Sequence, residues 1–174
     1  RVALTFDDGP NPAYTPKVLD ILNKYGIKAT FFLVGREVEK HRDLAKRIFR
    51  EGHLIGNHSY SHKGFGALDS KEIENEILRA QDVLIDAFGK NGGLFRPPQG
   101  ALNLKCLSIA KKHKFNTVLW SQEFGKMNLN SIKPGDIVLF HDDNDFILEK
   151  LPGIIEELKK KAYSFVSVDE MIKG

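Results

Sequence analysis

The sequence predicts a single α/β domain over residues 1–174, with parallel strands linked by helices. Short apolar runs alternate with longer segments whose apolar residues recur at helical spacing. Most of the short runs are apolar on both faces, as is typical of parallel strands that are covered by helices. This alternation fits an open sheet or a barrel, and 174 residues are few for a complete eight-unit barrel of ~250 residues.

Each expected element follows from its local pattern. The first apolar run, RVALTF, ends at Asp-Asp-Gly-Pro, and proline cannot continue a strand ladder. Several of the segments with helical period end in glycine, which commonly terminates a helix. The expected strands cover 1–6, 29–34, 53–57, 116–120, 136–140 and 164–168. The expected helices cover 15–26, 43–52, 70–89, 103–114 and 146–161.

Charge and composition argue against several classes of protein. The formal net charge of +3 comes from Lys and Arg scattered over helical segments, which indicates solvated helix faces rather than a nucleic-acid surface. Cys106 is the only cysteine, which excludes an internal disulfide and a cysteine metal cluster, and its apolar surroundings indicate a buried thiol. No run reaches the ~18 apolar residues of a membrane span, and the given sequence contains no signal peptide.

Ionisable and polar side chains follow five of the apolar runs. In a parallel sheet or barrel the working site lies beyond the carboxyl ends of the strands, so these side chains are expected to meet at one rim. They are Asp7 and Asp8, His58 and His62, Arg96 after GLF, Gln122 and Glu123, and His141 and Asp142.

The spacing of His58 and His62 suits a divalent metal, because residues four apart on one helical turn aim both imidazoles at a common point. The alternative is a surface or core pair of histidines. Glycines at 56, 64 and 66 make the segment a loop, where two histidines have little packing role. A carboxylate from another strand end would complete a site of two His and one Asp with an open water position.

The adjacent carboxylates of Asp7 and Asp8 fit that requirement. Gly9 and Pro10 end the strand, so both side chains can turn into the rim. An Asp-Gly-Pro turn that only caps the next helix needs a single carboxylate. Two carboxylates crowded together repel unless a cation or a proton separates them. One aspartate can therefore bind metal while the other acts as a base.

Four stretches, TFDDGP, HSYSH, RPPQG and IVLFHD, resemble the ordered motifs of the polysaccharide deacetylase family. These metal-dependent carbohydrate esterases remove N-acetyl groups from amino-sugar polymers. The tail LPGIIEELKKKAYSFVSVDEMI is similar to the family's last helix and strand. The resemblance implies a distorted, incomplete barrel of about seven parallel strands. It also implies site roles: metal ligands Asp8, His58 and His62, general base Asp7, Arg96 holding Asp7, and general acid His141.

The chemistry of amide hydrolysis fits these roles. A divalent ion, usually zinc in this family, can lower the pKa of its water to roughly 7 and polarise the acetyl carbonyl. Asp7, paired with Arg96, would take the proton of the water. A backbone N–H near Gln99 would help to hold the oxyanion. His141 would protonate the departing amine, since the reference pKa of histidine is ~6.5.

The segment WSQEFGKMN departs from the family pattern. The family commonly has an Asp-Trp pair after the fifth strand, in which the aspartate orients the catalytic histidine and the tryptophan walls the acetyl pocket. Here Glu123 and Phe124 can replace the pair through a local shortening, and we favour this register. An ungapped register instead puts Lys126 and Met127 there, which leaves His141 without a carboxylate.

Gln99 is a second departure, because the family usually has an aromatic residue there. The backbone donor survives, but a ring that could stack on sugar is lost. Trp120 is read first as strand-end packing, although it can also line the acetyl pocket. The expected substrate contacts are Pro98, Gln99, Trp120 and Phe124.

The predicted function is metal-dependent removal of N-acetyl groups from amino sugars in a polysaccharide or smaller glycoconjugate. The alternatives are a catalytically silent, metal-bearing glycan-binding domain and a deformylase or other amidase on the same scaffold. Two imidazoles and a carboxylate also accept Co²⁺, Ni²⁺ or Fe²⁺ in place of Zn²⁺. The expected partner is an N-acetylated glycan, with no nucleic acid, and the resemblance implies an extracytoplasmic or cell-envelope location in a bacterium. The sequence leaves the glycan and the oligomeric state open.

Overall fold

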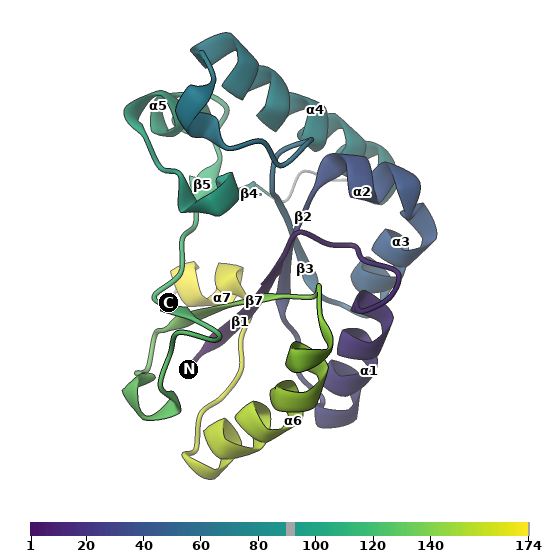
Figure 1. Ribbon diagram of the computed structural model, residues 1–174, viewed down its shortest axis with the longest axis vertical. Coiled ribbons are helices and arrows are strands. Elements are labelled where there is room, and N and C mark those ends of the chain that lie inside the picture. The colour runs from purple at the N-terminus through teal and green to yellow at the C-terminus, as the bar shows by residue number, and fades with distance from the viewer. Residues whose placement is uncertain (90–92, 174) are drawn as a thin grey trace.

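The computed structural model describes residues 1–89 and 93–173, and its centre is a sheet of seven parallel strands (Figure 1). The strand order is β5-β4-β3-β2-β1-β7-β6, so β5 and β6 form the two edges. The sheet curls into an incomplete barrel, which confirms the predicted fold class. The strands are β1 (Ala3–Asp7), β2 (Thr30–Leu33), β3 (Leu54–Asn57), β4 (Leu94–Phe95), β5 (Asn116–Thr117), β6 (Gln122–Glu123) and β7 (Ile137–His141).

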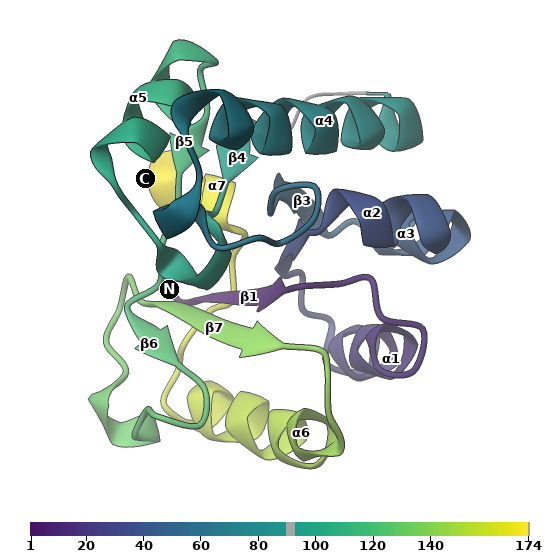
Figure 2. The ribbon, with the colours of Figure 1, turned by 45° about the horizontal axis from the view of Figure 1, so that its top comes forward.

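Helices surround the curled sheet (Figure 2). Local signals fix their ends: Gly26 terminates α1 with a left-handed φ of 65°, and Asp69 and Glu72 form a capping box at the start of α4. The helices are α1 (Thr15–Tyr25), α2 (Gly35–Lys40), α3 (Arg42–Arg50), α4 (Ser70–Phe88), α5 (Leu104–Lys112), α6 (Asp145–Lys160) and α7 (Val168–Lys173).

Alternation along each strand gives the sheet an outer and an inner face. On the outer face the rings of Phe31 and Phe140 stack on Phe6 at centroid distances of 5.0 and 5.4 Å, within a core shared with α1, α3 and α6. The inner face carries a smaller apolar cluster that includes Phe32 and, from the start of α7, Val168. Helix α7 therefore packs against the inside of the curl.

The inner face becomes polar toward the carboxyl ends of the strands. The parallel register sets Asp7 beside His141 on β7 and beside Phe32 on β2. Because residues paired across parallel strands share a face, Asp7 and His141 both lie on the inner face. The register thus brings residues that are distant in sequence to the same rim.

Two of the expected strands are wrong in extent. Residues 164–168 form only one isolated bridge, between Phe165 and Val2, before α7 begins at Val168. The expected strand at 116–120 is limited to β5, because the carbonyls of Val118 and Leu119 accept hydrogen bonds from Arg96 instead of continuing a ladder. Helices α2 and α7 were not anticipated, since both are short.

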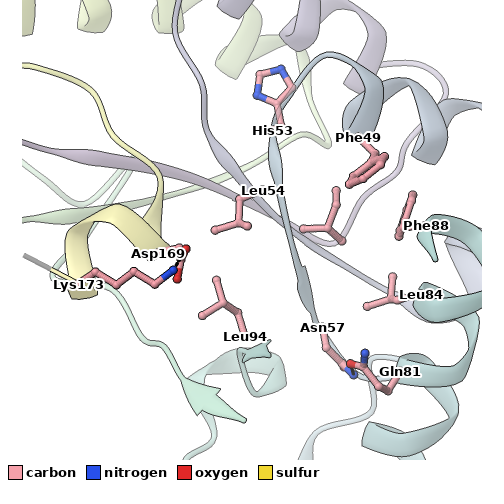
Figure 3. A pocket seen from close by; sticks show the side chains of 11 residues that line it. Phe49, His53, Leu54, Asn57, Gln81, Leu84, Phe88, Leu94, Asp169 and Lys173 are labelled. Atoms are coloured by element: carbon pink, nitrogen blue, oxygen red, sulfur yellow. Dashed lines mark hydrogen bonds and ion pairs between the residues drawn. The ribbon is translucent and has the colours of Figure 1, made fainter. Parts of the chain in front are cut away.

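A cavity of about 260 Å³ lies beside β3, between α3, α4 and α7 (Figure 3). Its lining is mixed. Phe49, Leu84 and Phe88 are apolar, whereas the imidazole of His53 lies at one end, the amides of Asn57 and Gln81 lie at the other, and Asp169 and Lys173 of α7 complete the wall. None of the residues expected at the metal site lines this cavity.

Candidate active site

Asp7 and Asp8 meet at the end of β1 even though strand alternation would separate them. Asp7 is the last residue of the strand and is 2% exposed. Asp8 has a left-handed φ of 74°, so the alternation stops there, one residue before Gly9. The two carboxylates therefore face the same cluster: Nε2 of His58 lies 3.7 Å from Oδ2 of Asp7 and 3.3 Å from Oδ1 of Asp8.

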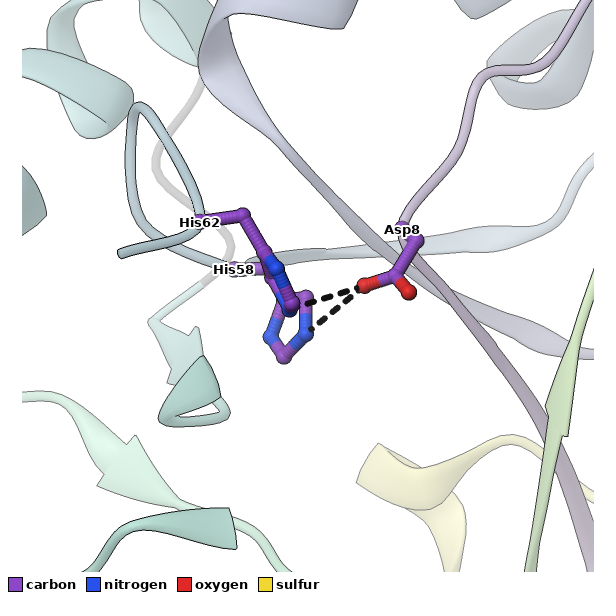
Figure 4. A group of neighbouring side chains, drawn as sticks. All are labelled: Asp8, His58 and His62. Carbon is purple, nitrogen blue, oxygen red and sulfur yellow. Dashed lines mark ion pairs between the residues drawn. The ribbon is translucent and has the colours of Figure 1, made fainter. Parts of the chain in front are cut away.

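The two histidines come from the loop after β3. This loop is not the helical turn that the spacing suggested, because Ser59 and His62 adopt left-handed φ values of 63° and 58°. Side chains of the loop hold it: Asn57 Oδ1 accepts from Ser59 N at 2.9 Å, and Ser59 Oγ accepts from His62 N at 3.1 Å. Both imidazoles thereby reach Asp8, whose Oδ1 lies 3.0 Å from His62 Nε2 (Figure 4).

These three side chains fit a divalent metal. One ligand atom from each of Asp8, His58 and His62 lies within 4.8 Å of the other two. His58 Nδ1 is 2.7 Å from the carbonyl oxygen of Arg96, an acceptor, so Nδ1 carries the proton and the lone pair of Nε2 faces Asp8. Among the described residues, the buried Oδ1 of Asp8 has no hydrogen-bond partner, as expected for an atom reserved for a cation.

The electrostatics of the cluster also favour a cation. Burial acts to raise the pKa of Asp8, but the imidazoles of His58 and His62 outweigh it and hold that pKa below its usual range. The adjacent Asp8 carboxylate raises the pKa of His62, opposed by burial and by the charge of Arg36. The site thus keeps Asp8 as a carboxylate, the form that binds a cation, and a metal ion would supply the positive charge next to it.

Arg96 is fully buried and uses its guanidinium to connect distant parts of the barrel. Nη1 donates to Asp7 Oδ1 and to Thr5 Oγ1, both at 2.8 Å. Nε and Nη2 donate to the carbonyls of Val118 and Leu119. Burial lowers the pKa of Arg96, and Asp7 opposes this change. The contacts hold the Asp7 carboxylate in one orientation.

The ring of Phe32 packs against the guanidinium of Arg96, and Gly56 leaves space for that ring. The guanidinium carbon lies 4.1 Å from the centroid of the Phe32 ring. A Cβ at Gly56 would come within 2.4 Å of that ring, so only glycine on β3 leaves Phe32 in this place. Thr5 and Phe32 were not anticipated from the sequence, and Gly56, expected to belong to the loop, lies inside β3. The signals available were a threonine in an otherwise apolar first strand and a glycine inside the third.

His141 stands at the end of β7, opposite Asp7. Its side chain is 38% exposed, and its Nε2 lies 4.0 Å from Asp8 Oδ2. Glu123 pairs with Leu139, two residues before His141, so Glu123 and His141 share the inner face. The carboxylate of Glu123 nevertheless pairs with Lys126 Nζ at 2.9 Å, and no contact with His141 is found among the described residues.

Of the four expected substrate contacts, Pro98, Gln99 and Trp120 lie near the cluster and Phe124 does not. Gln99, with a left-handed φ of 58°, and Trp120 line a cavity of about 150 Å³ together with Gly100 and Leu119, while Pro98 is buried beside Gln99. The Trp120 ring lies 5.6 Å from the Arg96 guanidinium carbon, which puts it next to the cluster.

Phe124, in contrast, is not brought to the cluster. Its ring packs against Phe140 and Phe146 at 5.3 and 5.2 Å. It lies on the outer face because it follows Glu123, which is on the inner face. The acidic-aromatic pair expected to replace Asp-Trp thus directs its two side chains to opposite faces.

Asp142, directly after His141, is 1% exposed and accepts a hydrogen bond from the Thr15 hydroxyl. A Cβ at Gly9 would come within 3.1 Å of its carboxylate, so the turn after Asp8 rests on Asp142. Burial raises the pKa of Asp142 to about 8. Asp142, which the sequence predicts at the rim, thus directs its carboxylate to the turn after β1.

Comparisons with known proteins agree with this geometry. The family model for polysaccharide deacetylase matches residues 1–118. A peptidoglycan-N-acetylglucosamine deacetylase of Bacillus cereus is 39% identical over 188 residues, covering 99% of this chain and 88% of that protein.

Two solved structures have the same fold. The Bc1960 peptidoglycan N-acetylglucosamine deacetylase matches with a TM-score of 0.90 and 34% identity, covering 98% of this chain and 87% of that one. BA3943 of Bacillus anthracis, described as a pseudoenzyme, matches with a TM-score of 0.89 and 30% identity, covering 98% and 64%. Since the fold is common to both, function rests on the side chains at the rim.

The four sequence motifs, the incomplete barrel and the matches over nearly the whole chain agree, and the resemblance drawn from the motifs is confirmed. This chain belongs to the polysaccharide deacetylase family, the metal-dependent carbohydrate esterases that remove N-acetyl groups from amino sugars.

Proposed function

We propose that this carbohydrate deacetylase acts on the N-acetylated sugars of peptidoglycan, with Asp7 as general base and His141 as general acid. One observation supports these roles above all. Asp7 forms an ion pair with Arg96, whereas the oxygen of Asp8 that has no hydrogen-bond partner faces two imidazoles. The choice of peptidoglycan is supported by the relatives, which are named peptidoglycan deacetylases.

Asp8, His58 and His62 would hold a divalent metal, and zinc is proposed because two imidazoles and a carboxylate with an open position form a common catalytic zinc site. When bound, the ion would supply an activated water and polarise the acetyl carbonyl. The proton on His58 Nδ1, held by the Arg96 carbonyl, keeps the other nitrogen of that ring available as a ligand.

Asp7 would take the proton from the attacking water. Its Oδ1 accepts from Arg96, and its Oδ2 lies on the His58 side of the carboxylate. Because Arg96 is buried and also bonded to Thr5, Val118 and Leu119, the carboxylate does not need to reorganise during the reaction.

His141 would donate the proton that the departing amine needs. Its partial exposure at the rim leaves the ring accessible to substrate. The backbone N–H of Gln99 is proposed as a donor to the oxyanion, and Trp120 as one wall of the acetyl pocket. The role of Glu123 as partner of His141 remains a prediction, since Glu123 now pairs with Lys126.

We also propose that the protein works in the cell envelope, because peptidoglycan is found there. Among the described residues, no helix has both the length and the apolar composition needed to cross a bilayer.

The test is acetate release from three substrates: peptidoglycan glycan strands, an N-acetylglucosamine oligomer, and an N-formylated oligomer scored by formate. Purified protein would be assayed as isolated, after chelation, and after Zn²⁺, Co²⁺, Ni²⁺ or Fe²⁺ is restored. The expected result is acetate from peptidoglycan strands, lost on chelation and regained with Zn²⁺.

Other outcomes would redirect the assignment. Formate release without acetate release would make the protein a deformylase. Metal and glycan binding with no turnover would support a silent binding domain. Activity that survives complete chelation would overturn the metal-dependent mechanism.

A further inference from the structure

A third cavity, of about 320 Å³, opens directly beside the candidate metal ligands Asp8, His58 and His62. Two of the candidate ligands, Asp8 and His62, form part of its wall, so a group bound there would adjoin the reacting sugar. The remaining wall comes from the β1–α1 loop and from the start of α2. These lining residues are Pro10, Asn11, Pro12, Val34, Arg36 and Glu37.

Arg36 is the one Lys or Arg side chain among those that line this cavity. Its backbone position is fixed, because Gly35 N and Arg36 N donate to the carbonyls of Ser59 and Tyr60 at 3.0 Å each, within the loop that carries both histidines. A Cβ at Gly35 would come within 3.1 Å of the backbone of Ala80, so the first turn of α2 also packs closely on α4. The start of α2 is therefore fixed to the loop after β3 that carries His58 and His62.

The guanidinium of Arg36 has unused hydrogen-bonding capacity. Its Nε donates to Glu37 Oε1 at 3.1 Å, while its two terminal nitrogens have no partner among the described residues. A guanidinium offers five N–H donors in a planar fork that matches a carboxylate. The buried Arg96, by comparison, uses Nε and both terminal nitrogens.

Glu37 does not cancel the positive charge at this position. Its Oε1 accepts from Lys40 Nζ at 3.0 Å as well as from Arg36, so the group of one carboxylate and two cations has a net charge of +1. Arg36 lies close to the cluster, because it lines the same cavity as Asp8 and His62. An anion in the cavity would therefore meet a cationic fork rather than a neutralised ion pair.

We propose that Arg36 binds a carboxylate of the substrate next to the sugar that is deacetylated, and so selects anionic glycans over neutral ones. This inference rests on the proposed function. In peptidoglycan the carboxylate can come from the lactyl group of N-acetylmuramic acid or, where that group is amidated, from the attached peptide. The rigid Pro10 and Pro12 would form the apolar side of the same cavity.

The test compares kcat/KM on three oligomers of equal length: a neutral N-acetylglucosamine oligomer, a glycan strand with free lactyl carboxylates, and a strand with peptide on those lactyl groups. The variants are Arg36→Gln, which removes the charge, and Arg36→Lys, which keeps the charge but loses the fork. Arg50→Gln, at the exposed end of α3 and outside the cavity, is the matched control.

The expected result is that Arg36→Gln lowers the ratio of kcat/KM on the anionic strand to that on the neutral oligomer by about ten- to a hundredfold, the range of one charge-assisted contact. Arg36→Lys should give an intermediate ratio, and the Arg50 control should keep the parent ratio. Higher ionic strength should reduce the difference between parent and variant. A fall with free lactyl groups identifies them as the ligand, whereas a fall only with peptide-bearing strands identifies the peptide.

An equal loss on all three oligomers, or an unchanged ratio on both anionic strands, would overturn the inference while leaving the deacetylase intact. Parent protein that releases acetate from none of the three would instead overturn the proposed function. Thermal unfolding of each variant separates these outcomes from misfolding, and Arg36→Lys preserves the test if Arg36→Gln does not fold.

Discussion

Asp7 and Asp8 are adjacent in sequence but have opposite surroundings. Asp7 is buried and receives a hydrogen bond from Arg96, whereas Asp8 receives none at its buried oxygen and faces His58 and His62. A carboxylate already held by a guanidinium is suited to move a proton, and one that faces two imidazoles is suited to bind a metal. The difference arises from one left-handed residue, Asp8.

Asp7→Asn should therefore leave the bound metal in place and lower kcat by a factor on the order of 10² to 10⁴, the usual range for a general base. Asp8→Asn should instead reduce metal content and activity together. Metal content by elemental analysis and kcat on the same sample would check this. If Asp7→Asn loses the metal while Asp8→Asn keeps it, the two roles must be exchanged.

The link between Glu123 and His141 can be tested at the same scale. If Glu123 orients His141 during turnover, the double variant Glu123→Gln/His141→Ala should lose no more activity than His141→Ala alone. The measurement is kcat/KM for the two single variants, the double variant and the parent. Fully additive losses would mean that Glu123 serves only its observed partner, Lys126.

At the scale of elements, the active site depends on how closely neighbouring strands approach. Gly56 on β3 leaves space for the Phe32 ring of β2, and that ring lies under the guanidinium of Arg96, which follows β4. Three successive strands of the sheet thus set the position of the Asp7 carboxylate. The packing inside the curl therefore also orients Asp7, the proposed base.

Gly56→Ala should push Phe32 and Arg96 away from their positions, lowering the free energy of unfolding by about 1–3 kcal/mol as overpacking does. It should also reduce kcat more than KM rises, because Asp7, the proposed base, is misplaced. Gly153→Ala is the matched control: a Cβ there meets nothing within 4 Å, and alanine inside α6 should stabilise the protein by about 0.5–1 kcal/mol. Unchanged activity in Gly56→Ala would refute this coupling.

At the scale of the whole molecule, the curl of the sheet gathers groups from four strand ends into one cluster. Asp7, His58, Arg96 and His141 lie at the carboxyl ends of β1, β3, β4 and β7. The rest of the molecule contributes stability, including polar groups far from the cluster. His53 is one of these: its Nδ1 accepts a hydrogen bond from Ala29 N at 3.1 Å.

Burial, with a contribution from the charge of Lys28, lowers the pKa of His53 to about 4, while Glu51 opposes this shift. In the unfolded chain this histidine becomes protonated below about pH 6.5, whereas in the folded chain it stays neutral until about pH 4. Protonation therefore favours the unfolded state, and the protein loses stability as the pH falls from about 6.5 to about 4. His53→Asn, whose amide oxygen can accept from Ala29, should flatten that part of the curve of melting temperature against pH.

Melting temperatures between pH 4 and pH 8, recorded for parent and His53→Asn, would check this expectation. The same substitution at the partly exposed His41 controls for the loss of a histidine from the chain. Parallel curves for parent and His53→Asn would contradict it.

The alternation of strands and helices, the polar strand ends and the set of candidate ligands could all be predicted from the sequence. These follow from local patterns, since the period of apolar residues and the position of Gly-Pro steps depend on neighbours in the chain. The four motifs also predicted the protein family, because they occur in the family's order between Thr5 and Asp142.

The pairing of side chains, in contrast, depends on the folded arrangement of the whole chain. Arg96 reaches Thr5 and Asp7 from about ninety residues away, and no local pattern encodes that contact. Glu123 and Phe124 fill the acidic and aromatic positions in sequence, yet the pleat of β6 sends them to opposite faces, and Lys126 takes the carboxylate. A strand's period is set by its own backbone, whereas the partner of a side chain is set by what the whole fold brings within a few ångströms.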